Sequence, residues 1–159
     1  MTDSAPEFAA TVRAFFDAYR HKTLATLRKD GSPRISGIEA HFATGELWLG
    51  MMHGSRKAQD LQRDPRFALH SASVDPDDRD PSAWRGDAKL SGLAVEITDP
   101  ETLEAALQAI GHEEPSGGEA HMFRAAIREA VVTRVGDPAD HLVIELWREG
   151  HGLQRFERR

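Results

Sequence analysis

The stretch ELWLGMMHGSRKA, residues 46–58, joins an apolar run to a basic turn. The run Glu46–Met52 predicts a strand, and Gly54 ends it just before a short helix. Ser55 is a residue type that caps helices, whereas Arg56 and Lys57 fall in the first helical turn, where the helix dipole disfavours positive charge. An anion such as a phosphate would make the two cations favourable there. The alternative interpretation is a solvated basic turn on a surface helix.

The composition limits the kind of protein that can contain this stretch. The chain has 159 residues, 40% of them apolar and 29% charged, which predicts one globular domain over residues 1–159. Its net charge of −6 argues against a nucleic-acid partner, so any anion site must be a local basic cluster. Cysteine is absent, which excludes thiolate chemistry and fits a reducing cytoplasm. We find neither a signal peptide nor a membrane-spanning run, and we expect a cytoplasmic protein without a membrane partner.

On both sides of this stretch, alternating apolar residues and Gly-containing turns predict an antiparallel meander that continues into further strands. The expected strands are Thr23–Arg28, Arg34–Phe42, Glu46–Met52, Phe67–Ser71, Ala88–Thr98, Ile127–Val135 and Leu142–Trp147, and a last extended piece covers Leu153–Glu157. Helical spacing predicts helices over residues 6–19, Ser55–Arg63 and Asp99 to Gly111. Residues 73–86 and 112–122 read as loops, and Gly92 marks a bulge. The fold class is therefore mainly β: a six- to seven-stranded antiparallel barrel with peripheral helices, because closure removes sheet edges.

This order of elements, with Gly54-Ser55-Arg56-Lys57-Ala58 and Asp64-Pro65-Arg66-Phe67, resembles the pyridoxamine 5′-phosphate oxidase-like family over roughly residues 20–98. The family consists of split β-barrels that bind flavin, and the resemblance implies FMN, or alternatively the deazaflavin coenzyme F-420. It further implies a homodimer with the flavin at the interface and a small-molecule substrate. The implied cofactor-binding residues are Arg34, Ile35, Ser36, Gly37, Met51, Met52, Ser55, Arg56 and Lys57. We add His53, which directly precedes the basic turn and could donate to a phosphate or to the ring edge.

The chain also departs from the vitamin-forming members of that family. Those end with a Trp and an Arg-apolar-His-acid-Arg pattern, whereas here Trp147 is followed, after a longer gap, by Arg155-Phe156-Glu157-Arg158. The histidine is missing, and Glu39 also differs from the usual residue, so we do not expect pyridoxamine phosphate oxidation. Two classes remain open: a flavin- or deazaflavin-dependent oxidoreductase, and a non-catalytic carrier of flavin or haem. The sequence requires no protein nucleophile or general base, and we name no catalytic residue.

Other candidate sites have weaker patterns. The eight histidines, His112 and His121 among them, show no metal-ligand spacing. Asp75, Asp77, Asp78 and Asp80 lack the glycine and glutamate of a calcium loop. Trp84 in the same loop could equally cover a pocket or pack down.

Overall fold

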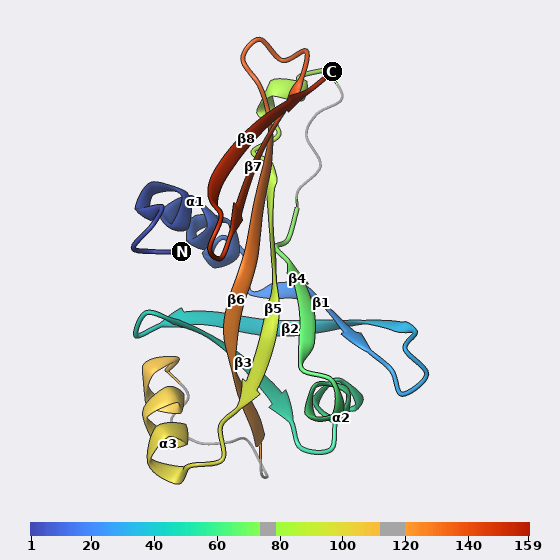
Figure 1. Ribbon diagram of the computed structural model, residues 1–159, viewed down its shortest axis with the longest axis vertical. Helices are drawn as coiled ribbons and strands as arrows, with labels where there is room; N and C mark the ends of the chain where they lie inside the picture. Colours follow the sequence, from blue (N-terminus) through green and yellow to red (C-terminus); the bar gives the residue numbers. More distant parts are fainter. Residues whose placement is uncertain (74–78, 112–119) are drawn as a thin grey trace.

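Eight antiparallel strands form one sheet in the computed structural model, which describes residues 1–73, 79–111 and 120–159 (Figure 1). The strands are β1 (His21–Leu27), β2 (Pro33–Ala43), β3 (Glu46–Met52), β4 (Arg66–His70), β5 (Asp87–Glu96), β6 (Ala120–Val135), β7 (Leu142–Arg148) and β8 (Gly152–Arg158). Their order is β3-β2-β1-β4-β5-β6-β7-β8, and an additional pairing of β3 with β6 closes the first six into a barrel. The predicted barrel is confirmed, and β7 and β8 extend the sheet beyond it.

The helices lie around the barrel. They are α1 (Pro6–Asp17), α2 (Arg56–Arg63), α3 (Pro100–Ala109) and the single turn η1 (Pro81–Ala83). The predicted helix over residues 6–19 thus ends two residues earlier. Asp99 caps α3 as its position before Pro100 predicts: its carboxylate accepts hydrogen bonds from the Thr102 N–H at 2.8 Å and the Thr102 hydroxyl at 2.6 Å.

The main core fills the barrel and continues beneath α1. Val12 and Phe16 of α1 are buried against inward side chains of the sheet, among them Leu24, Leu49 and Phe123. The alternation of side chains along each strand explains why these sheet residues point inward, because every second residue of a strand points to the same face. A smaller cluster lies under α3, where Trp48 and Met122 pack with the helix. This second cluster places α3 outside the barrel, over β3 and β6.

One predicted loop is wrong in part. Residues 120–122 belong to β6, which begins at Ala120 instead of Ile127. The early half of β6 pairs with β3, with Met51 opposite His121 and Leu49 opposite Phe123. This pairing joins segments about seventy residues apart, and a local pattern does not reveal it.

The predicted bulge is present. The register between β5 and β6 shifts between Ser91 and Gly92. A Cβ added at Gly92 would lie 2.0 Å from the carbonyl oxygen of Ala126, so the close approach of the two backbones requires glycine here.

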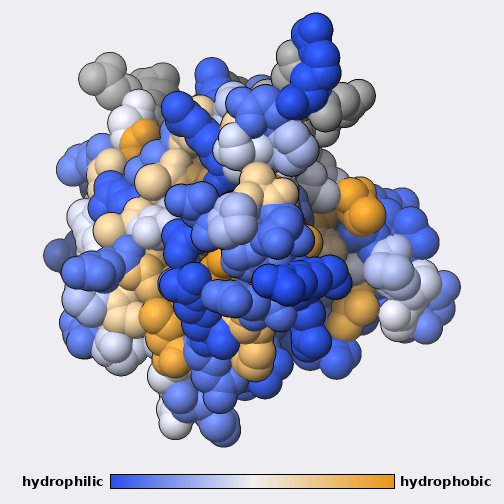
Figure 2. All heavy atoms as spheres, turned by 90° about the horizontal axis from the view of Figure 1, so that it is seen from above, coloured by the Kyte–Doolittle hydropathy of each residue, from blue (hydrophilic) through white to orange (hydrophobic). Residues whose placement is uncertain are grey.

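The first half of β5 and the second half of β6 extend beyond the barrel. Together with β7 and β8 they form an arm that carries the C-terminus (Figure 1). From the end of this arm, hydrophobic side chains are visible only in small groups between hydrophilic ones (Figure 2). In the described part of the chain, every helix is too short or too polar to cross a membrane.

Candidate functional site

The turn between β3 and α2 has the geometry of a helix start with an unused hydroxyl. Gly54 adopts a φ of +66°, which side-chain-bearing residues rarely adopt, and Ser55 occupies the cap position with its carbonyl accepting from the Gln59 N–H at 3.1 Å. The Ser55 side chain, however, makes no capping hydrogen bond, contrary to its predicted role. Among the described residues, Ser55 Oγ is the buried side-chain polar atom that lacks any hydrogen-bond partner. A buried hydroxyl without a partner is costly, so this atom suits a ligand.

The two cations of the turn differ in their surroundings. Lys57 reaches across to β2 and donates from Nζ to the carbonyl oxygen of Gly37 at 2.6 Å. Burial lowers the pKa of Lys57. Arg56 is exposed, and its guanidinium donates to Gln59 at 3.3 Å. The structure therefore joins Lys57 to Gly37 of β2, whereas the exposed Arg56 side chain is held by its contact with Gln59.

A buried carboxylate, which the sequence patterns do not single out, fixes α2 to the barrel. Asp60 is 3% exposed and accepts hydrogen bonds from Arg34 Nε at 2.6 Å, Thr26 Oγ1 at 3.0 Å and Arg63 at 3.0 Å. Burial alone would raise the pKa of Asp60, but the hydrogen bonds from Arg34, Arg63 and Thr26 outweigh it and lower the pKa. Arg34, a predicted cofactor residue, is thus held against α2. Its terminal guanidinium nitrogens have no other partner among the described residues.

The other predicted residues of β2 and β3 divide between the two faces of the sheet. Ile35 is 75% exposed on β2, and a Cβ added at its neighbour Gly37 would meet nothing within 4 Å. Met52 at the end of β3 is 79% exposed. Ile35 and Gly37 share the exposed outer face of β2 beside Lys57, and Met52 adds an exposed apolar side chain at the end of β3. Ser36 is half-buried on the other face of β2, and the Met51 side chain is buried in the core, so the structure does not bring Met51 to this surface.

His53 and His121 border the same turn. Their rings stack with centroids 5.3 Å apart and planes 8° from parallel. His121 Nε2 accepts from the Gly54 N–H at 3.4 Å, and His121 Nδ1 lies 2.7 Å from a carboxylate oxygen of Glu96. The tautomer with the proton on Nδ1 satisfies both contacts. Sequence reasoning missed His121 as a residue of this region, because strand pairing and not sequence spacing brings it to Gly54.

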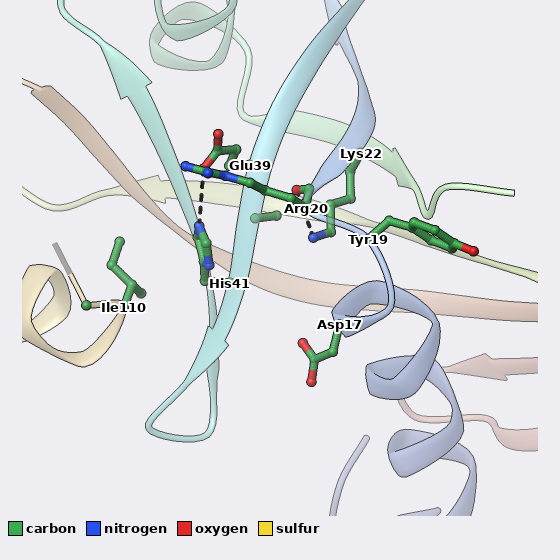
Figure 3. A pocket seen from close by; sticks show the side chains of 9 residues that line it. Asp17, Tyr19, Arg20, Lys22, Glu39, His41 and Ile110 are labelled. Carbon is green, nitrogen blue, oxygen red and sulfur yellow. Dashed lines mark hydrogen bonds and ion pairs between the residues drawn. The ribbon is translucent and has the colours of Figure 1, made fainter.

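A cavity of about 410 Å³ lies near the other end of β2 (Figure 3). It is lined by Asp17, Tyr19, Arg20, Lys22, Glu39, Ala40, His41, Ile110 and Gly111. Arg20 Nε pairs with Glu39 at 2.9 Å, and this hydrogen bond lowers the pKa of Glu39. Glu39, the departure noted in the sequence, is therefore part of the cavity wall.

The remaining predicted features lie apart from the turn. Trp84 is half-buried and donates to Ser73 Oγ at 3.2 Å, and it does not line the cavity. Trp147 is buried and donates to Ser4 Oγ at 2.9 Å, while Arg155 is exposed on β8. Asp75, Asp77, Asp78 and His112 lie outside the described residues.

Comparison with known proteins identifies the family. The model of the pyridoxamine 5′-phosphate oxidase family matches residues 8–133, most of the chain, and the chain belongs to this family. No curated protein matches it.

Solved structures share the fold at low sequence identity. A pyridoxamine 5′-phosphate oxidase-related, FMN-binding protein from Nostoc punctiforme is 14% identical with a TM-score of 0.63, covering 97% of this chain and 95% of its own. A conserved hypothetical protein from Mycobacterium tuberculosis is 22% identical with a TM-score of 0.60, covering 76% and 81%. A protein from Bacteroides thetaiotaomicron, provisionally named a 5-nitroimidazole antibiotic resistance protein, is 13% identical with a TM-score of 0.60, covering 76% and 80%. At these identities the likeness concerns the fold alone.

Proposed function

We propose that the chain binds FMN and acts as a flavin-dependent oxidoreductase on a small conjugated substrate. The observation that carries the proposal is the buried Ser55 hydroxyl without a partner, beside Lys57 and at the N-terminus of α2. Hydroxyl, ammonium and helix N–H groups together match the donor set that a phosphate requires. The FMN-binding relative from Nostoc punctiforme has the same fold, which adds support.

The outer surface of β2 suits the rest of the cofactor. Next to the anion site, Gly37 leaves the strand backbone uncovered, and Ile35 and Met52 offer exposed apolar side chains. A planar ring could lie against this surface without displacing a side chain. Arg34 has guanidinium nitrogens available and, through Asp60, ties β2 to the helix that would hold the phosphate.

When bound, a flavin supplies hydride and single-electron chemistry. The roles left to the chain are to bind the phosphate, orient the ring and exclude water. A deazaflavin bound at the same surface is the alternative cofactor. The exposed apolar side chains also favour a homodimer in which a second copy would cover the cofactor, a part of the proposal that rests on the family resemblance.

The phosphate site is tested by a paired charge removal. We expect Arg56→Ala with Lys57→Ala to weaken FMN binding at least tenfold, because hydrogen bonds to charged groups contribute about 1.5–3 kcal/mol each. The matched control is Arg28→Ala with Lys29→Ala, which removes the same charge from the exposed turn before β2. Ser55→Ala should weaken FMN binding without destabilising the cofactor-free protein, since the hydroxyl has no partner to lose. Equal FMN affinity in the double variant and its control would reject the site.

The cofactor and activity are tested on the purified protein. Denaturing extraction followed by mass spectrometry identifies a bound flavin or deazaflavin. The FMN-loaded protein, given NAD(P)H, should reduce conjugated acceptors, a 5-nitroimidazole among them, and should release little hydrogen peroxide with pyridoxamine phosphate. Robust peroxide release with that substrate would make it a vitamin-forming oxidase, and flavin reduction without any acceptor turnover would make it a carrier.

A further inference from the structure

The cavity beside β2 contains a buried lysine that forms no ion pair with the described residues. Lys22 is 6% exposed, and its Nζ donates to the carbonyl oxygen of Arg20 at 3.0 Å. An ammonium has three N–H donors, so this single bond leaves two unused. Lys22 has no ion-pair partner in the described part of the chain. A buried charge without a counter-ion is unfavourable, and a ligand that supplies one would be bound strongly.

The two carboxylates of the cavity are already paired with other cations. Asp17 pairs with Arg13 at 3.1 Å, and Glu39 pairs with Arg20 at 2.9 Å. Both are close enough to oppose the effect of burial on Lys22, yet burial prevails and lowers the pKa of its ammonium. With Asp17 engaged by Arg13 from outside the wall and Glu39 engaged by Arg20, Lys22 is the cation of the wall that has no ion-pair partner among the described residues.

The rest of the wall indicates the size and polarity of the ligand. Ile110 and Tyr19 border the cavity from opposite sides, and Ile110 contributes an aliphatic side chain (Figure 3). A volume of about 410 Å³ accommodates a small organic molecule.

We propose that this cavity is a second binding site, separate from the phosphate site at α2, for a small organic carboxylate with an apolar body. Lys22 holds the carboxylate, and Ile110 contacts the apolar part. One cation without an ion-pair partner matches a monoanion, which distinguishes the ligand from the phosphate dianion expected at Ser55 and Lys57.

The test uses benzoate as the probe and benzamide as its uncharged counterpart, on the cofactor-free full chain. Calorimetric titration should give benzoate binding and at least tenfold weaker benzamide binding. Lys22→Met, which keeps the length of the side chain, should weaken benzoate binding at least tenfold, and Lys22→Arg should restore most of it. Lys29→Met is the matched control, since Lys29 is exposed in the turn before β2 and outside the cavity.

Two further readouts separate a ligand site from a structural role. Lys22→Met should leave the melting temperature of the free protein unchanged or higher, because it removes an unpaired buried charge. The Arg56→Ala, Lys57→Ala variant should bind benzoate as the unaltered protein does, so failure of the FMN site and of this site are distinguishable. Equal binding of benzoate and benzamide, no benzoate binding at millimolar concentration, or unchanged benzoate affinity in Lys22→Met would overturn the proposal.

Discussion

At the scale of single residues, Asp60 joins the barrel to the helix that carries the proposed phosphate site. Its carboxylate is hydrogen-bonded by Arg34 from β2, Thr26 from β1 and Arg63 from α2. Removing one partner of such a network leaves the others as unpaired polar groups. Asp60→Asn should therefore destabilise the fold by about 2–3 kcal/mol at pH 7, less than for a fully buried pair because the arginines are partly exposed.

The effect should depend on pH in a defined direction. Because the pKa of Asp60 is lowered in the folded protein, its contribution is complete above the ordinary value of 3.8 and declines as the pH falls below it. Urea unfolding of the protein and of Asp60→Asn should give stability curves that converge in acid. Asp64→Asn, which alters a carboxylate paired with exposed Arg66, should cost much less at pH 7. A difference between the protein and Asp60→Asn that stays constant from pH 7 to pH 2.5 would contradict this role.

Sequence patterns single out residues whose structural setting is defined by their neighbours in the chain. Ser55 and Lys57 stand at a strand-to-helix turn, and this local placement, together with the family resemblance, predicted an anion site. Asp60 and His121 act through partners on other elements, so their spacing in the chain carries no signal. The same limit explains Ser55 itself: its type predicted a helix cap, whereas its hydroxyl is without a partner in the folded protein.

At the scale of elements, two glycines within strands have opposite functions. Gly92 allows the close approach of β5 to β6, where an added Cβ would lie 2.0 Å from the Ala126 carbonyl oxygen, whereas an added Cβ at Gly37 meets nothing within 4 Å. We expect Gly92→Ala to cost about 1–3 kcal/mol or more, because the backbone must shift. Gly37→Ala should change stability by only about 0.5 kcal/mol but weaken FMN binding. Urea unfolding and flavin titration of both variants check this, and an equal stability loss would contradict it.

Local patterns predicted the meander, α2 and the bulge, because turn residues and alternation are properties of neighbouring residues. They failed for the first half of β6, which precedes the predicted start at Ile127. That segment is a strand because β3 and β5 flank it, with Phe123 opposite both Leu49 and Glu96. Tertiary pairing of this kind overrides local preference.

At the scale of the whole molecule, exposed apolar side chains lie on the outer surface of β2 and at the end of β3. Ile35 and Met52 are 75% and 79% exposed, and a flavin bound against them would itself remain partly in water in a single copy of the chain. A second copy related by a twofold axis would bury these side chains and shield the cofactor. The homodimer predicted from the family resemblance would meet this need.

The prediction is that the protein has twice the monomer mass of 17.6 kDa at micromolar concentration. Light scattering and sedimentation should report this mass, and dilution below the dimer dissociation constant should release FMN, because cofactor binding and assembly are then linked. Ile35→Lys should weaken the dimer by introducing a like charge from each copy at the interface, whereas Lys29→Glu in the exposed turn should leave it intact. A particle of monomer mass that retains FMN at full affinity would place the cofactor site within one chain.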